Sequence, residues 1–290
     1  MSPNGKQPVE IIDWGALFED PSKPLVVDLG CGAGRYILLM AHRNGRRQNY
    51  LGVDVHKALL DRANGWAAAR SLSDSVHYLQ ANAVASASVL FGSYPGPIEL
   101  VSIQYPDPQQ RRQRHVVGRE LVEALASVLK PGARVYLASD FEDTATYMRN
   151  AFELYGAGRF CVDDIHATQL VFPCKPLTTL VKTREPSSVG TLFMREKTRT
   201  RDGVRQQGPV SVATAGPNEA TSEGEPGDPG QEGRGASSVD EDELLWFQGS
   251  WQQAGWLGEN PIGVPTEREV YVEKATMGRV YRILLVRSVP

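Results

Sequence analysis

The chain has few cysteines and no long hydrophobic run, and these two absences exclude several classes of protein. Its 290 residues include Cys31, Cys161 and Cys174, an odd number with no CxxC pair, which favours neither a disulfide framework nor a zinc site. No stretch approaches the roughly 20 consecutive apolar residues that span a bilayer, and the start, MSPNGKQPVE, lacks the apolar core of a secretory signal. We therefore expect a soluble, intracellular protein with no membrane or metal partner, and the sequence leaves plastid, cytoplasm and nucleus open.

The net charge of −3 comes mainly from one segment. Between Gly216 and Leu244 there are nine Asp or Glu residues against the single Arg234, so the rest of the chain carries 30 basic and 25 acidic residues. A mildly basic folded part is compatible with a polyanionic partner, although many soluble enzymes have the same balance.

Composition also indicates how the chain is divided. The segment from about 198 to 240 is rich in Gly, Pro, Ser, Glu and Gln and has almost no large apolar residue. Such a segment buries too little surface to offset the entropy of ordering, so we predict that it is disordered. A strand-like sequence, GRVYRILLVR, returns near the end. We expect an N-terminal extension over 1–23, one domain formed by 24–165 and 246–290, and an insertion over 166–245.

Before the insertion, short apolar runs alternate with amphipathic stretches, the rhythm of βαβ units. Near-continuous apolar strands suit a parallel sheet that is covered on both faces, so we predict a doubly wound, mostly parallel α/β fold. The expected strands are Leu25–Leu29, Tyr50–Val53, Val76–Gln80, Ile98–Ile103 and Arg134–Ala138. The expected helices lie near Tyr36–Asn44, Lys57–Arg70, Val116–Leu129 and Glu142–Leu154.

A glycine-rich loop follows the first expected strand, and an acid follows the second. The loop reads DLGCGAG from Asp28 through Gly30 and Gly32 to Gly34, and Asp54 lies twenty residues further on. Glycines permit a tight turn and a close approach of the backbone to a ligand, while an acid after the second strand can accept hydrogen bonds from two ribose hydroxyls. These features predict a nucleoside site. The alternative is a tight strand-to-helix turn with solvated acids.

The spacing of the glycines separates two classes of cofactor. A dinucleotide loop reads GxGxxG, whereas this loop reads DxGxGxG, with Asp28 two residues before the first glycine. A carboxylate there repels a pyrophosphate but can pair with the ammonium group of a methionine moiety. The site therefore favours S-adenosylmethionine, with Asn82 after the third strand placed to bind adenine. A nicotinamide-dependent oxidoreductase is the alternative for this part of the chain.

The fourth expected strand ends in SIQYPDP and leads into a run of arginines. In a doubly wound sheet this loop lies over the cofactor, where the methyl acceptor must be held. Asp107, between two prolines, is the candidate site acid, and Arg111, Arg112, Arg114 and Arg119 form a basic patch beside it. A carboxylate with a basic rim suits a nucleobase on a phosphate chain. The alternative is a proline-shaped turn followed by a solvated charged face.

The order of the short motifs along the chain resembles one family. DLGCGAG, GVDVH, NA, YPDP followed by basic residues and RH, then ASD, and finally TEREV before GRVYR look like the tRNA (guanine-N7-)-methyltransferases, with wording closest to the plant and algal branch. The resemblance covers about Pro24–Phe152 and Gly255–Arg287. It implies a Rossmann-like class I methyltransferase with a seven-stranded sheet, which forms N7-methylguanosine in the variable loop of tRNA.

Motifs and resemblance together predict the site. Asp107 is the implied catalytic acid, S-adenosyl-L-methionine the cofactor, S-adenosyl-L-homocysteine the product and tRNA the partner. The predicted cofactor contacts are Asp28, Gly30, Gly32, Gly34, Asp54, Val55, Asn82, Ala83 and Tyr105. The predicted tRNA contacts are Arg111, Arg112, Arg114, Asp140, Thr266 and Glu269. The chain departs from the family pattern at Gln109, where an aromatic residue or histidine is common, and at Arg111, where lysine is usual.

Several of these motifs have other interpretations. Thr266 and Glu269 have the spacing of a capping box, in which both side chains satisfy backbone donors at a helix start, and Asp140 can cap the helix after the fifth strand. A methyltransferase of a different substrate, and a non-catalytic tRNA-binding protein with the same fold, are the alternative functions.

Overall fold

The computed structural model describes residues 12–106, 116–175 and 243–289, and the predicted disordered segment from about 198 to 240 lies outside them. Their main element is a seven-stranded sheet with the order β3-β2-β1-β4-β5-β9-β6. Strands β1 to β5 run parallel, and β9 is antiparallel to both of its neighbours. The predicted mostly parallel sheet is confirmed. No helix in these ranges is long and apolar enough to cross a membrane.

The strands of the main sheet lie close to the expected ranges where a range was expected. They are β1 (Leu25–Leu29), β2 (Asn49–Asp54), β3 (Val76–Gln80), β4 (Ile98–Gln104), β5 (Arg134–Ser139), β6 (Phe160–Val162) and β9 (Tyr281–Arg287). A separate two-stranded antiparallel sheet is formed by β7 (Val171–Phe172) and β8 (Trp256–Leu257).

The helices fall between the strands. They are α1 (Trp14–Leu17), α2 (Arg35–Asn44), α3 (Lys57–Ala68), α4 (Ala83–Gly92), α5 (Arg119–Val128), α6 (Glu142–Tyr155), α7 (Ile165–Thr168), α10 (Glu243–Trp246) and α11 (Glu267–Val270). Shorter turns are η1 (Gly45–Arg47), η4 (Ser250–Ala254) and η5 (Tyr271–Ala275). Helix α5 begins later than the expected Val116, because Gly118, in an extended conformation, precedes its first turn.

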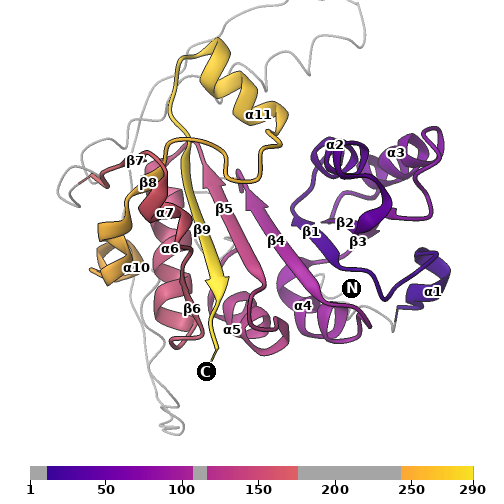
Figure 1. The fold of residues 1–290 in the computed structure, drawn as a ribbon, viewed down its shortest axis with the longest axis horizontal. Helices are drawn as coiled ribbons and strands as arrows, with labels where there is room; N and C mark the ends of the chain where they lie inside the picture. The colour runs from indigo at the N-terminus through magenta and orange to yellow at the C-terminus, as the bar shows by residue number, and fades with distance from the viewer. Residues whose placement is uncertain (1–11, 107–115, 176–242, 290) are drawn as a thin grey trace, which may run out of the picture. The chain divides into compact units, whose positions relative to one another are not determined.

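Successive apolar residues on one strand serve two different cores. In β1, Leu25 and Val27 belong to a core that also holds α4, α5 and α6, whereas Val26 belongs to a second core with α2 and α3. Because side chains alternate between the two faces of a strand, a sheet covered on both faces needs apolar residues at neighbouring positions. The helices therefore form one layer on each side of the sheet (Figure 1), and the doubly wound arrangement is confirmed.

Helix α4 was not expected from the sequence. Its sequence, AVASASVLFG, mixes small, apolar and hydroxyl residues without a clear polar face, so periodicity gives little signal. The helix starts where the Asn82 side chain accepts hydrogen bonds from Val84 N at 3.0 Å and Ala85 N at 3.4 Å. Such a cap satisfies two backbone donors that a helix start leaves free. Ala87 and Leu90 then pack into the core.

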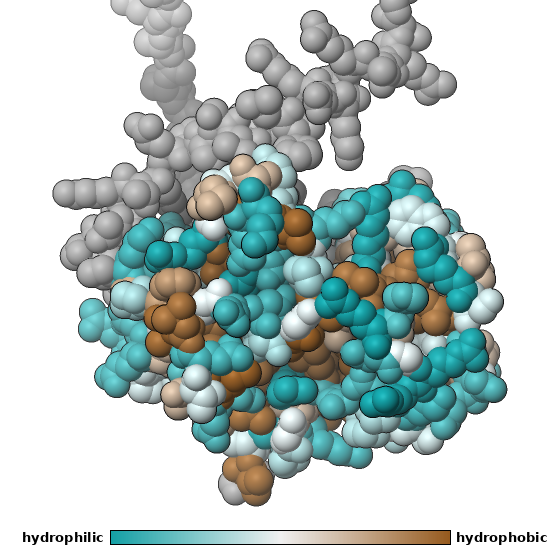
Figure 2. Space-filling model, turned by 45° about the horizontal axis from the view of Figure 1, so that its top comes forward, coloured by the Kyte–Doolittle hydropathy of each residue, from teal (hydrophilic) through white to brown (hydrophobic). Residues whose placement is uncertain are grey.

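The parallel strands end at one edge of the sheet, at the top of Figure 1, and α11 lies over the same edge. Strand β9 is antiparallel to β5, with Tyr281 paired to Ser139, so the residues that precede β9 lie beside the end of β5. Val264 and Val272 of this segment are buried in the core that contains α2 and α3. Figure 2 turns this edge toward the viewer and shows hydrophobic groups surrounded by hydrophilic ones.

Both flanks of residues 176–242 pack against α6. Glu142 Oε1 accepts hydrogen bonds from Lys175 N at 2.8 Å and from Trp256 Nε1 at 3.1 Å. The guanidinium of Arg149 lies 5.0 Å from the centre of the Trp256 ring. The chain on either side of this range is therefore anchored to one helix, and the domain boundaries expected from composition stay a prediction.

The last glycine of the glycine loop is required by its backbone angle and by packing. Gly34 has φ +75°, and an added Cβ would lie 2.4 Å from Tyr78 Cε1 and 2.9 Å from Ala63 Cβ. We expect Gly34→Ala to lower the free energy of unfolding by about 2 kcal/mol in urea denaturation. Gly65→Ala in α3 is the control, since its Cβ meets nothing within 4 Å and alanine favours a helix by up to about 1 kcal/mol. Equal stability of Gly34→Ala and wild type would contradict the packing argument.

Candidate cofactor and substrate site

The glycine loop turns sharply at the end of β1. Gly30, Gly32 and Gly34 all have positive φ, at 80°, 53° and 75°, a region that residues with a side chain rarely adopt. At Gly30 and Gly32 an added Cβ would meet nothing within 4 Å, in contrast to Gly34. The first two glycines therefore border open space at the strand ends, where a ligand can approach the backbone, while the third is packed.

Asp54, at the end of β2, holds the glycine loop. Its Oδ2 accepts from Gly32 N at 2.9 Å, its Oδ1 accepts from His56 N at 3.0 Å, and Oδ1 lies 2.8 Å from His56 Nδ1. Burial by itself would raise the pKa of Asp54, but the hydrogen bonds from His56 and Gly32 outweigh it and lower that pKa. A carboxylate has about four acceptor sites, so these three contacts leave capacity for a ribose hydroxyl.

The pKa of Asp28, two residues before the first glycine, is shifted in the opposite direction from that of Asp54. Its side chain is buried, and burial together with the nearby Asp54 charge raises the pKa of Asp28 to about 8, although Gln104 acts in the other direction. Near neutral pH the chain therefore carries one ionised and one largely protonated acid beside the loop. Burial and both carboxylates also raise the pKa of the Cys31 thiol, so Cys31 stays protonated and is not a nucleophile.

Gln104, at the end of β4, shows that the buried polar groups here are incompletely satisfied. Both atoms of its side-chain amide are buried, and neither makes a hydrogen bond of normal geometry with the described residues. The amide nonetheless lies close enough to Asp28 to influence that carboxyl group. Because buried amides nearly always have partners, an orphaned amide beside a protonated acid fits a site for a zwitterionic ligand.

The other predicted cofactor contacts lie around this loop. Val55, directly after Asp54, is 54% exposed, and Ala83 is the first residue of α4. The Oδ1 atom of Asn82 caps α4, and its exposed side chain keeps the amide nitrogen available as a donor. Asn82 thus has a structural role that the sequence did not predict, and its contact with adenine stays a prediction.

Tyr105 follows β4 in a strained conformation, with φ +50°. Its backbone N–H donates to Ala138 O at 2.8 Å, and its hydroxyl is buried with no hydrogen-bond partner among the described residues. Burial and the charge of Glu269 raise the pKa of Tyr105, while Arg282 and Thr266 act against this. The hydroxyl therefore faces the C-terminal segment. The contact of Tyr105 with the cofactor stays a prediction.

The TERE turn, Thr266 to Glu269, begins α11 and is held by contacts with Arg282 of the sheet and with Asn260. Thr266 Oγ1 accepts from Glu269 N at 3.1 Å, so the capping role of Thr266 is confirmed. The Glu269 carboxylate does not complete a reciprocal capping box; it accepts from Asn260 Nδ2 at 2.9 Å and pairs with Arg282 Nη2 at 2.7 Å. The side chains of Glu269 and Arg282 are each 1% exposed, and Arg282 also bonds Glu273. Glu269 faces the sheet, not solvent.

Asp140, after β5, pairs with the same turn. Arg268 Nη2 lies 2.5 Å and Nε 3.2 Å from Asp140 Oδ2. The expectation that Asp140 caps α6 is wrong: the residue at that position is Phe141, whose N–H donates to Ser139 Oγ at 3.1 Å. The Asp140 carboxylate binds the Arg268 guanidinium in place of the backbone donors at the start of α6. Asp140 and Thr266 are thus brought together, as the resemblance implies, through the turn that carries Arg268.

Two further contacts join the turn to the helix that follows the glycine loop. Arg35, the first residue of α2, forms an ion pair with Glu267, although the two are 232 positions apart. Arg43 Nη1 donates to Gly263 O at 2.7 Å. The predicted cofactor side and the predicted tRNA side therefore lie against each other.

The predicted catalytic acid and its basic patch fall in a gap of the described chain. Asp107, Arg111, Arg112 and Arg114 all lie outside the described residues. Arg119, on α5, is described: it pairs with Glu123 at 3.3 Å, and its guanidinium lies 4.4 Å from the Tyr155 ring centre. Arg119 is thus engaged on its own helix and with α6.

Three residues that shape this edge were not predicted from the sequence. Gln104 offered a weak signal, as a polar residue at the end of an apolar strand, and Arg282 offered another, as a charge within the apolar run YRILLVR. Arg268 offered none, since only the fold brings it to Asp140.

Comparison with known proteins agrees with this geometry. The family model described as "Putative methyltransferase" matches residues 22–179. A tRNA (guanine-N(7)-)-methyltransferase of Synechocystis sp. is 36% identical over 155 residues, which are 52% of this chain and 72% of that protein. One from Synechococcus elongatus is 34% identical over 63% of this chain and 87% of its own length. Among solved structures, 16S rRNA methyltransferase KamB is 18% identical, with a TM-score of 0.40, over 68% of this chain and 92% of that chain.

The chain belongs to the tRNA (guanine-N(7)-)-methyltransferase family. Its methyl donor is S-adenosyl-L-methionine. The residues at the glycine loop fit this donor, because Gly30 and Gly32 border open space and the buried Gln104 amide has no hydrogen bond of normal geometry within the described ranges. Asp28 and Asp54 lie beside the same loop, and their contacts with the ammonium group and the ribose hydroxyls stay predictions.

The protonation of Asp28 makes the stability of this family member depend on pH. The folded chain holds the Asp28 proton up to about pH 8, whereas the ordinary value is 3.8, so the folded state binds more protons between these values. Without cofactor, stability should therefore fall as pH rises from 4 to 8, by at most about 1.4 kcal/mol per pH unit. Asp28→Asn should flatten this slope in thermal melts at pH 5 to 9 and weaken cofactor binding. An unchanged slope would show that Asp28 is ionised throughout.

The buried pair of Glu269 and Arg282 should dominate the stability of the TERE turn. Glu269→Gln or Arg282→Met leaves the other charge buried with fewer partners, so each should lower the free energy of unfolding by about 3 kcal/mol. The double variant Glu269→Gln/Arg282→Met removes both charges and should cost clearly less than the sum of the two single changes. Urea denaturation measures all three, and strict additivity would mean that the pair is not coupled.

Proposed function

We propose that this chain forms N7-methylguanosine in tRNA, with S-adenosyl-L-methionine as the methyl donor and S-adenosyl-L-homocysteine as the product. Curated relatives at about one-third identity carry the name tRNA (guanine-N(7)-)-methyltransferase. The observation that carries the proposal is the contact between the two predicted halves of the site. Arg35, next to the glycine loop, pairs with Glu267 of the TERE turn, so donor and acceptor sides share one edge of the sheet.

The cofactor side is assigned from its charges. We assign Asp54 to the ribose hydroxyls, since its lowered pKa keeps it an acceptor. Asp28 and Gln104 are assigned to the methionine end, where an ammonium group would favour the ionised form of Asp28. Asn82, which keeps an amide donor at the start of α4, is assigned to the adenine. When bound, the cofactor supplies an electrophilic methyl group.

The acceptor side needs positioning more than proton transfer. Guanine N7 has an exposed lone pair in the neutral base, so its methylation requires no general base. The chain must hold N7 in line with the methyl group and exclude other orientations. We assign this to Asp107, which accepts hydrogen bonds from the N1 and N2 donors of guanine. Its carboxylate orients the ring and stabilises the positive charge that develops on it.

The TERE turn is assigned an indirect part in tRNA binding. Glu269 is buried and paired with Arg282 of β9, so it fixes the turn to the sheet and does not contact the tRNA itself. Thr266 and the Asp140–Arg268 pair lie closer to the surface, at the edge where the parallel strands end. The arginines after Asp107 are assigned to the phosphate backbone of the tRNA.

The central test is methyl transfer from labelled cofactor to unmodified tRNA, followed by mapping of the modified base. Asp107→Ala should lower kcat by about 100-fold or more and leave cofactor affinity, measured by calorimetry, nearly unchanged. Asp54→Ala is the matched carboxylate removal on the other side of the site and should weaken cofactor binding by about tenfold. Methylation at a position other than guanine N7, or tRNA binding by the wild type without turnover, would refute the proposed activity.

A further inference from the structure

Positive charge is concentrated on one stretch of the chain, most of whose basic residues lie outside the site described above. Residues 35–74, which form α2, η1, β2 and α3, contain seven Lys or Arg against three Asp, although the whole chain has a net charge of −3. The basic side chains of the two helices and the turn between them are exposed. In Figure 2 deeply hydrophilic colouring lies over the right-hand side, where α2 and α3 lie in Figure 1. We call the outer surface of α2, η1 and α3 the basic face.

The basic face is organised around an aromatic ring. The guanidinium groups of Arg35 and Arg62 lie 5.3 Å and 5.0 Å from the centre of the half-buried Trp66 ring. Arg70 Nη1 donates to Trp66 O at 3.0 Å. Stacking against an aromatic ring holds a guanidinium in place without neutralising it. These arginines therefore stay charged and oriented at the surface.

Acidic neighbours neutralise only part of this face. Arg35 pairs with Glu267 of the TERE turn, Arg46 pairs with Asp74 at 2.7 Å, and Lys57 pairs with Asp61 at 2.7 Å. Arg47 and the stacked Arg62 form no ion pair with any described residue. The face thus keeps a net positive charge after its internal pairs are counted.

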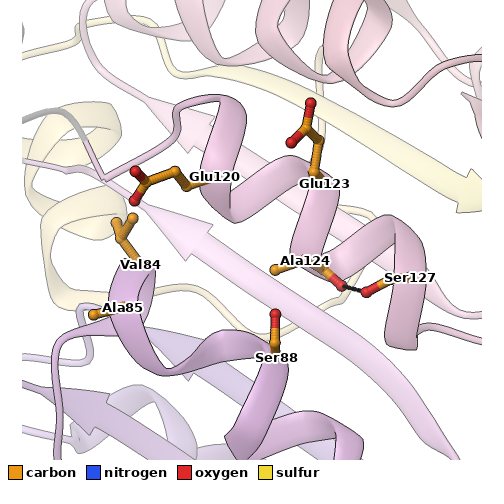
Figure 3. A pocket seen from close by; sticks show the side chains of 7 residues that line it. All are labelled: Val84, Ala85, Ser88, Glu120, Glu123, Ala124 and Ser127. Atoms are coloured by element: carbon orange, nitrogen blue, oxygen red, sulfur yellow. Dashed lines mark hydrogen bonds between the residues drawn. The ribbon is translucent and has the colours of Figure 1, made fainter. Parts of the chain in front are cut away.

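On the opposite side of the sheet, a pocket has acidic and no basic lining residues. Between α4 and α5 lies a pocket of about 620 Å³, and its charged lining residues are Glu120 and Glu123 (Figure 3). The other lining residues, Val84, Ala85, Ser88, Ala124 and Ser127, carry no charge. This pocket therefore offers no positive charge to a polyanion, whereas the basic face attracts one.

The basic face is continuous with the predicted substrate side. Arg35 pairs with Glu267, and Arg43 donates to Gly263 O. A groove of about 590 Å³ lies between α2 and the TERE turn. Its lining residues include Leu39 of α2, Thr266 at the start of α11, and Lys274. A long ligand held at the TERE turn therefore has α2 and α3 directly beside it.

We propose that the basic face of α2, η1 and α3 is a second docking surface for tRNA, which binds the sugar-phosphate backbone beyond the nucleotide that is methylated. The inference rests on the proposed function, since it takes tRNA as the substrate. The ligand chemistry is a sugar-phosphate chain, because guanidinium groups bind phosphates whatever the sequence, and the deep, narrow major groove of an RNA helix is closed to side chains. The face then orients the tRNA while the site selects the base.

Arg47→Glu/Arg62→Glu tests the docking surface, because both side chains are exposed and neither belongs to the cofactor or TERE residues. The control is Lys23→Glu/Lys130→Glu, an equal charge change at residues that precede β1 and β5, at the other edge of the sheet. Binding of an unmodified tRNA transcript is measured over a range of salt concentrations, together with kcat and KM. The arginine variant should raise Kd and KM by about tenfold, and the slope of log Kd against log salt should fall by about one for each lost phosphate contact.

The kcat and cofactor affinity of the arginine variant should stay near wild type, and the lysine variant should leave Kd, KM and the salt slope unchanged. Equal effects of both variants would mean that only total charge matters and would overturn the docking surface, as would an arginine variant with wild-type Kd and salt slope. Failure of the proposed function is distinct: the wild type would then bind tRNA, with the variants still ranked as expected, but would not methylate guanine. A wild type that binds no tRNA overturns both.

Discussion

The buried ion pair between Glu269 and Arg282 is the constraint on which the arrangement of this site depends. Arg282 lies on β9, and Glu269 ends the TERE turn, so the pair ties that turn to the sheet. Two charges that are each 1% exposed are tolerated only when their partners are fixed, which Asn260, Glu273 and Gly258 provide. Once the turn is fixed, Arg268 reaches the end of β5 and Glu267 reaches the start of α2.

The same edge of the sheet holds two acids in different protonation states. Asp54 receives hydrogen bonds and stays charged, whereas Asp28 is buried without enough of them and keeps its proton to about pH 8. This contrast lowers the repulsion between the two carboxyl groups before the cofactor arrives. Under the proposed assignment of Asp28 to the ammonium group of the donor, cofactor binding favours ionisation of Asp28 and is coupled to release of a proton.

The net charge of −3 does not show how unevenly acidic and basic residues are distributed along the chain. The segment from Gly216 to Leu244 carries nine of the acids, α2 and α3 carry an excess of arginine, and the pocket between α4 and α5 is lined by two glutamates. For a tRNA methyltransferase the local field matters more than the sum, because phosphate contacts act over short, screened distances. The arginine-rich helices and the acidic pocket lie on opposite sides of one sheet.

The sequence alone determined the strands, the glycine loop and the acids beside it, because these signals are local: apolar periodicity defines β1 to β5, and positive φ at Gly30, Gly32 and Gly34 requires glycine. The YPDP and TERE motifs were likewise visible, and they pointed to the family. The tertiary structure decided what each polar group touches. Only the fold turned the Tyr105 hydroxyl toward the TERE turn, gave Asp140 its partner Arg268 and buried Glu269 against Arg282. Those contacts join residues that are distant in the chain, and no local pattern encodes which buried charges will meet.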